Sequence, residues 1–145
     1  MKEVSFFVPG IPKGQPRPRA FKMGNRVRVY DPGTAENWKS CIAMAVQDQL
    51  PEIPFSGPVT YSIQFYLQRP KNLFRKKDPE GIIPHTKKPD IDNLLKSVFD
   101  AFTHLGLWHD DTQLYKGTAE KNYHSKTGKP GAMMKFFFME VPDDN

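Results

Sequence analysis

Two pairs of aspartates have the types and spacing that could do chemistry in this chain. Asp90 and Asp92 lie in the run K-P-D-I-D-N-L-L-K over residues 88–96, and Asp110 and Asp111 directly follow Trp108-His109. The protein has a net charge of +5, so closely spaced carboxylates need an explanation other than overall composition. Carboxylate oxygens are ligands that hard divalent cations prefer. The pattern therefore predicts a divalent-metal site in a protein that binds a polyanion.

Each pair taken alone also has a simpler explanation. Aspartate is favoured at the N-cap and in the first turn of a helix, where the helix dipole stabilises it, so Asp90 and Asp92 could serve only to start a helix. Asp110-Asp111 could be an ordinary polar turn after Trp108. Both explanations stay open at the level of sequence.

The metal-site interpretation requires the Asp110-Asp111 turn to come together with Asp90 and Asp92. This depends on whether the strand after Asp111 lies alongside the helix that begins near Asp90. If three carboxylates converge, their repulsion raises some of their pKa values in the empty site, and a divalent cation relieves it. Ligation by oxygen alone favours Mg²⁺, with Mn²⁺ as a substitute, over zinc.

Lys96 follows Asp92 by four residues and shares its helix face. A lysine beside a metal-bound phosphodiester could contact the scissile phosphate or neutralise charge in the transition state. The alternative is an ion pair with Asp92 or Asp100 along the helix, which contributes only about 0.2–0.5 kcal/mol.

Several other chemistries are disfavoured. The single cysteine, Cys41, excludes an internal disulfide and is expected on the apolar side of a helix. No G-x-x-x-x-G-K-[ST] loop is present, so we expect no nucleotide cofactor. His109, beside the acidic turn, is either a general base or a surface residue. The histidines lack zinc-site spacing; they are His85, His104, His109 and His124.

Basic residues gather in two segments, one within the first thirty residues and one over residues 69–88. Two basic segments beside an acidic site are typical of a surface that contacts a phosphate backbone. The residues predicted to contact DNA are Lys13, Arg17, Arg19, Lys76, Lys87, Lys88 and Lys96.

Alternating apolar residues predict strands over 3–8 and 60–67, and Gly24-Asn25 predicts a hairpin between 21–23 and 26–30. Thr34 is the expected N-cap of a helix that ends near Leu50. The predicted elements of the second half are a long, mobile basic loop over 69–88, a helix from Asp90 to Leu105, and a final strand pair over 113–124 and 133–141.

This order predicts one domain over residues 1–145, of the α/β or α+β class, with a mixed sheet and two main helices. No apolar run approaches the roughly 20 residues of a membrane span, and the N-terminus is expected to be a strand and not a signal peptide. The expected setting is the reduced cytoplasm of a bacterium or of a phage-infected cell.

Two segments carry a resemblance to a known family. K-P-D-I-D-N-L-L-K-S-V-F-D-A-F, followed by G-L-W-H-D-D-T-Q-L, resembles the signature region of the RusA family of Holliday junction resolvases. The segment 9–19, running on to Tyr30 and Pro32, resembles the opening of phage-type members. The resemblance implies a homodimeric endonuclease that cuts four-way DNA junctions symmetrically with Mg²⁺ or Mn²⁺.

When the roles of the family's motif residues are transferred to matching positions of this sequence, the resemblance implies that Asp90, Asp92 and Asp111 are the catalytic, metal-binding carboxylates. It makes Asp110 an auxiliary ligand and gives Lys96 a role in DNA contact and catalysis. Lys87 and Lys88 match the basic approach to the motif.

Two alternatives belong to other classes. One is a non-catalytic protein that binds branched DNA and keeps the acidic residues as a structural remnant; the intact set of three aspartates and Lys96 argues against it. The other is a D-x-D nucleotide-sugar transferase, for which 145 residues leave little room for a donor-binding domain.

Overall fold

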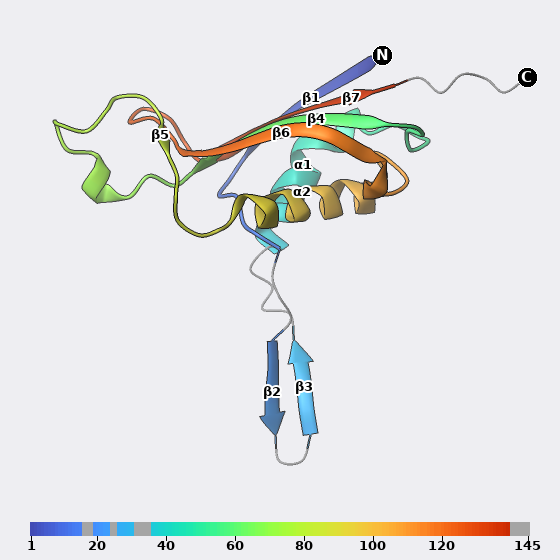
Figure 1. The fold of residues 1–145 in the computed structure, drawn as a ribbon, viewed down its shortest axis with the longest axis horizontal. Helices are drawn as coiled ribbons and strands as arrows, with labels where there is room; N and C mark the ends of the chain where they lie inside the picture. The colour runs from blue at the N-terminus through green and yellow to red at the C-terminus, as the bar shows by residue number, and fades with distance from the viewer. Residues whose placement is uncertain (16–18, 24–25, 31–35, 140–145) are drawn as a thin grey trace, which may run out of the picture.

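The structure is a computed structural model that describes residues 1–15, 19–23, 26–30 and 36–139 (Figure 1). Its main feature is a five-stranded sheet with the order β1-β7-β4-β6-β5. The strands are β1 (Lys2–Pro9), β4 (Val59–Leu67), β5 (Ile83–Pro84), β6 (Leu114–Tyr123) and β7 (Gly131–Phe138). The pair β4–β6 is parallel and the other neighbours are antiparallel, so the sheet is mixed, as predicted.

Two helices, α1 (Glu36–Val46) and α2 (Ile91–Leu105), lie on the same face of this sheet (Figure 1). Alternation explains the burial: Val59, Ile63 and Phe65 of β4 point toward the helices and are fully buried. The aromatic centre of the core includes Phe102 of α2, whose ring lies 5.1 Å from that of Phe136 on β7. The α+β class and the two main helices are thereby confirmed.

Helix α2 begins and ends where its sequence indicates. Leu94, Val98 and Phe102 form the apolar stripe and are fully buried against the sheet. Gly106 ends the helix with a φ of 82°, a left-handed conformation that glycine adopts without steric cost, and its N–H donates to the carbonyls of the last turn.

The final strands differ from the prediction in their pairing. Both strands exist, but β6 and β7 are not neighbours, because β4 lies between them. Strand β6 pairs in parallel with β4, and the connection between those two strands contains α2. A helix that connects parallel neighbours runs antiparallel to them, so β6 begins at the C-terminal end of α2.

The predicted hairpin is present as β2 (Arg19–Met23) and β3 (Arg26–Tyr30), which pair antiparallel with Met23 opposite Arg26. Figure 1 shows it standing away from the sheet and helices. Gly24-Asn25 and the predicted cap Thr34 lie outside the described residues. The helix expected to end near Leu50 is α1 followed by a 3-10 turn, η1 (Gln47–Gln49).

The segment 69–88 has more order than expected of a long mobile loop. It contains a 3-10 turn, η2 (Lys71–Leu73), and strand β5. Arg69 is buried, with 2% of its surface exposed, and its guanidinium donates to the carbonyls of Leu73 and Pro79 at 2.8 and 2.6 Å. A buried guanidinium that satisfies several carbonyls gives the segment a defined path. Among the described residues, no helix is long and apolar enough to cross a membrane.

Candidate metal-binding site

Asp90 and Asp92 lie at the N-terminal end of α2, where both are exposed. Asp90 is the N-cap residue by backbone position, and its carbonyl accepts from the N–H of Leu94 at 3.1 Å. Its side chain, however, makes no capping hydrogen bond. Within the described part of the chain, no hydrogen bond or ion pair holds the Asp92 carboxylate either. A capping hydrogen bond therefore does not account for these two side chains, although Asp92 lies in the first turn, where the helix dipole favours a carboxylate.

Basic residues surround this end of α2. The N-terminal segment passes beside it, with the N–H of Gln15 donating to the carbonyl of Asn93 at 3.1 Å. Gly14 lies so close to Asn93 that a Cβ there would be 2.7 Å from its amide nitrogen. Lys13 is exposed just before this contact, and Lys87 and Lys88 are exposed just before Asp90. These basic residues, which were predicted to contact a polyanion, thus share one region with the first aspartate pair.

Asp110 has a structural role in the turn that precedes β6. It caps the 3-10 turn η3 (Asp111–Gln113): its carboxylate accepts from the N–H of Thr112 at 2.9 Å, and the Gln113 side chain accepts from the N–H of Asp110 at 3.0 Å. The backbone hydrogen bond from Thr112 is the main cause that lowers the pKa of Asp110. This carboxylate is already committed to the backbone.

Asp111 has the opposite electrostatic environment. Although Asp111 is exposed, desolvation of its carboxylate is the main cause that raises its pKa, and the carboxylates of Asp110 and Asp100 add to the effect. A cation at Asp111 would relieve this repulsion. Of the two turn aspartates, Asp111 is therefore the better candidate for a metal ligand.

The two pairs do not converge within one chain. Strand β6 does lie alongside α2, but it starts at the C-terminal end of the helix and Asp111 comes just before it (Figure 1). At about 1.5 Å per residue, the 15 residues of α2 span roughly 22 Å. No group of three or more metal-ligating side chains occurs among the described residues. The convergence on which the metal-site interpretation depends is therefore not observed within one chain.

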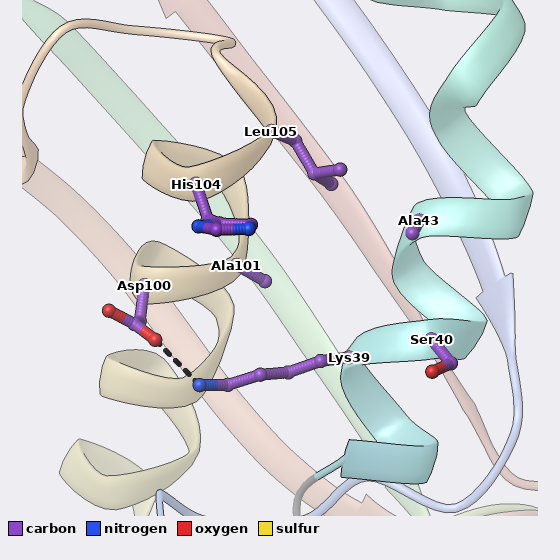
Figure 2. Close-up of a pocket in the computed structure, with 7 residues that line it drawn as sticks. All are labelled: Lys39, Ser40, Ala43, Asp100, Ala101, His104 and Leu105. Carbon is purple, nitrogen blue, oxygen red and sulfur yellow. Dashed lines mark hydrogen bonds and ion pairs between the residues drawn. The ribbon is translucent and has the colours of Figure 1, made fainter.

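Lys96 is exposed, and within the described residues it forms no ion pair with Asp92 or Asp100. Asp100 instead pairs with Lys39 of α1, whose Nζ lies 2.6 Å from the carboxylate (Figure 2). This ion pair and His104 line a pocket of about 340 Å³ between α1 and α2. The purely structural explanation of Lys96 as a helix ion pair is thus not supported.

The other residues considered in the sequence analysis differ in how far they are buried. Cys41 is a half-buried free thiol that packs against the core, as expected. His109 is exposed beside the acidic turn, whereas His85 and His124 are buried. Lys76 is exposed on the 69–88 segment. Arg17 lies outside the described residues, and of Arg19 only the strand position in β2 is described.

Sequence reasoning missed Lys121. Its ammonium donates to the carbonyls of Lys87 and Pro89, at 2.5 and 2.8 Å, immediately before Asp90. The available signal was its position in the strand: Ala119, Lys121 and Tyr123 alternate on one face, and the same face of β4 is apolar.

The fold and the site define a small α+β protein with exposed carboxylates at the basic end of one helix and a second acidic turn at its other end. A protein-family model described as Endodeoxyribonuclease RusA matches residues 9–131. The chain belongs to this family.

Curated relatives agree with this assignment. The chain is 32% identical over 125 residues to the uncharacterized protein YqaN of Bacillus subtilis (strain 168). This alignment covers 83% of this chain and 87% of the relative. It is 25% identical over 105 residues to the crossover junction endodeoxyribonuclease RusA of Escherichia coli (strain K12), and equally to that of Enterobacteria phage 82; these alignments cover 72% of this chain and 74% of each relative.

Proposed function

We propose that this protein is a metal-dependent endodeoxyribonuclease that resolves four-way DNA junctions by paired, symmetric cleavage of phosphodiester bonds. The observation that carries the proposal is the state of Asp90 and Asp92: in a chain of the RusA family, both carboxylates are exposed and neither makes a capping hydrogen bond. Such resolution takes place during DNA recombination and repair, and the proposed location is the cytoplasm of a bacterium or of a phage-infected cell.

The residues fit a hard divalent cation. Asp90, Asp92 and Asp111 offer oxygen ligands alone, which suits Mg²⁺, with Mn²⁺ as a substitute. The chemistry that such an ion supplies is polarisation of the phosphodiester and activation of the attacking water. Asp110, whose carboxylate already caps η3, contributes at most an auxiliary oxygen.

Lys96 acts on the phosphate in this proposal. It lies one helical turn after Asp92, is exposed, and has no competing carboxylate partner in the described residues. Its ammonium would contact the scissile phosphate and neutralise negative charge that develops there.

A site with all three aspartates requires two copies of the chain. Helix α2 is about 22 Å long, with Asp90 and Asp92 at its N-terminal end and Asp111 toward its C-terminal end. We propose a homodimer in which Asp90 and Asp92 of one copy meet Asp111 of the other. Twofold symmetry then produces two equivalent sites, one for each of the two strands that are cut.

DNA binding is proposed along the basic surfaces. The candidates are the N-terminal segment with Lys13, the β2–β3 hairpin with Arg19, and the approach to α2 with Lys87 and Lys88. Arg17 and Lys76 belong to the same two basic segments. Contacts of this kind are made to phosphates, so the affinity for DNA should fall steeply as salt is raised.

Cleavage of a labelled four-way junction, compared with a linear duplex of the same sequence, tests the function. With Mg²⁺ the wild-type protein should nick the junction at symmetric positions and leave the duplex intact, and EDTA should abolish the nicks. Tight junction binding without nicks under Mg²⁺ or Mn²⁺ would favour a non-catalytic branched-DNA-binding protein.

A further inference from the structure

Lys121 of β6 holds the backbone that leads into α2. Its Nζ donates to two carbonyls of this approach, that of Lys87 at 2.5 Å and that of Pro89 at 2.8 Å. Pro89 immediately precedes Asp90. Two hydrogen bonds from one ammonium therefore fix the chain at the residue before the first proposed metal ligand.

The position of this ammonium needs a specific explanation. The N-terminal end of a helix carries a partial positive charge, so the helix dipole does not favour a lysine there. Within the described residues Lys121 forms no ion pair with a carboxylate. Its ammonium instead donates hydrogen bonds to two carbonyls of an irregular segment. Such charge-assisted hydrogen bonds are stronger than neutral ones.

Neighbouring contacts fasten the same segment to β6. Strand β5 pairs with β6 through Ile83 opposite Tyr123, and the N–H of His85 donates to the carbonyl of Lys121 at 3.1 Å. The buried His85 ring packs edge-on against Tyr123, with ring centroids 4.7 Å apart. Residues 83–89 are thus attached to β6 at successive points, and the Lys121 side chain makes the last attachment before the helix.

We propose that Lys121 is a positioning residue for the metal site: by holding the carbonyls of Lys87 and Pro89, it fixes where Asp90 and Asp92 present their carboxylates. This proposal rests on the proposed function, because it gives those two aspartates the role of metal ligands. Lys121 acts through the backbone and has no direct part in the reaction. Residues that orient metal ligands typically change metal affinity by about 10–100-fold when they are replaced.

Three variants separate positioning from general stability and from charge. Lys121→Met removes both hydrogen bonds and keeps a similar apolar stem, whereas Lys121→Arg keeps donors that can reach the carbonyls. Lys126→Met is the matched control: Lys126 also donates to a carbonyl, that of Arg75 at 2.8 Å, and pairs with Glu80, but it lies away from Asp90.

The first readout is Mn²⁺ binding to the protein without DNA, measured by calorimetry. Lys121→Met should raise the Kd for Mn²⁺ by about 10–100-fold. Lys121→Arg and Lys126→Met should stay within about threefold of wild type, because each keeps the Lys87 and Pro89 carbonyls bonded. Equal affinity of Lys121→Met and wild type, or an equal loss in Lys126→Met, would overturn the proposal.

Junction binding in EDTA distinguishes positioning from a charge contact with DNA. Positioning predicts that Lys121→Met binds the junction within about threefold of wild type when metal is absent. A large loss of binding that Lys121→Arg restores would instead make Lys121 a phosphate contact and overturn the proposal.

Amide hydrogen exchange tests the anchoring by Lys121 without metal or DNA, and therefore independently of the proposed function. The Leu94 N–H bonds to the carbonyl of Asp90, so its exchange reports on the first turn of α2. Lys121→Met should exchange faster there than Lys126→Met does. If wild type binds no Mn²⁺, the proposed function fails; unchanged Leu94 exchange in Lys121→Met means that the anchoring itself is wrong.

Discussion

Asp110 and Asp111 are adjacent in the sequence, yet their carboxylates have pKa values shifted in opposite directions. Asp110 accepts a backbone hydrogen bond from Thr112, which lowers its pKa. Asp111 is exposed, but desolvation of its carboxylate and the nearby charges of Asp110 and Asp100 raise its pKa. One aspartate stabilises the turn as an anion, and the other is destabilised as an anion. The two should respond differently to substitution and to pH.

Asp110→Ala should lower the melting temperature by a few degrees at pH 7. The lowered pKa means that the stabilising contribution is present above the unfolded-state pKa near 3.8 and is lost as the pH falls through the folded-state value. The difference between variant and wild type should therefore shrink as the pH falls below about 4. Thermal unfolding at pH 7 and at pH 3 measures it.

Asp111→Asn should keep or raise the melting temperature at pH 7. Because the pKa of Asp111 is raised in the folded protein, its ionised form lowers the free energy of unfolding. This loss is absent below the unfolded-state pKa and is complete once the pH has risen through the folded-state pKa. The same variant should lose junction cleavage, because a proposed metal ligand is missing. A melting temperature several degrees lower, with cleavage intact, would make Asp111 a structural residue.

Lys96→Ala should reduce junction cleavage by at least about 100-fold, within the range for loss of a charge that stabilises a transition state. Its effect on the melting temperature should be small, because Lys96 is exposed and is not paired with Asp92 or Asp100. Lys39→Ala is a useful contrast, since it removes the observed Lys39–Asp100 ion pair and should leave cleavage unchanged. Intact cleavage in Lys96→Ala would reduce this lysine to a surface residue of the helix.

Arg69→Met should destabilise the protein by about 2–4 kcal/mol, because it leaves several carbonyls of the 69–88 segment without their donor. Arg75→Met, which removes only the contact of an exposed guanidinium with Asp78, should change the free energy of unfolding much less. Urea unfolding of both variants measures the difference. Equal stability of Arg69→Met and wild type would show that the segment needs no central donor.

Mixing two inactive variants tests the shared site. A dimer of one Asp92→Asn copy and one Asp111→Asn copy keeps one complete site if each site draws Asp92 from one copy and Asp111 from the other. Mixed and re-equilibrated variants should therefore regain nicking of the junction, up to about a quarter of the wild-type number of sites. No recovery, with mixed dimers demonstrated, would mean that each chain forms its site alone.

Local elements of this fold follow from the sequence, because their signals are local. The alternation of Val4, Phe6 and Val8 predicts β1, and the apolar stripe ending at Gly106 predicts α2 with its correct C-terminal end. Strand neighbours do not follow in this way. Alternation indicates which face of a strand is buried, but not that β4 lies between β6 and β7.

The same limit applies to the site. The aspartates were identified by residue type and spacing, and the capping explanation for Asp90 could be removed only by the observed geometry of its side chain. The relative position of the two pairs depends on β6 being parallel to β4, a long-range pairing that places Asp111 toward the far end of α2. Buried Arg69 was missed because an isolated basic residue in a basic chain has no distinctive pattern. Lys121 was missed because its place on the helix-covered face of the sheet becomes evident only once β6 is paired with β4.

Comparison of wild type with Asp92→Asn on a labelled four-way junction tests the central claim most directly. Cleavage is measured with Mg²⁺ and with EDTA, and binding of the same junction is measured alongside. We predict paired symmetric nicks by wild type with Mg²⁺ only, and none by Asp92→Asn, which should bind the junction at least as tightly because it lacks one negative charge near the phosphates. Nicking by a folded Asp92→Asn variant at the wild-type rate, or wild-type nicking that persists in EDTA, would contradict a metal-dependent reaction at these aspartates.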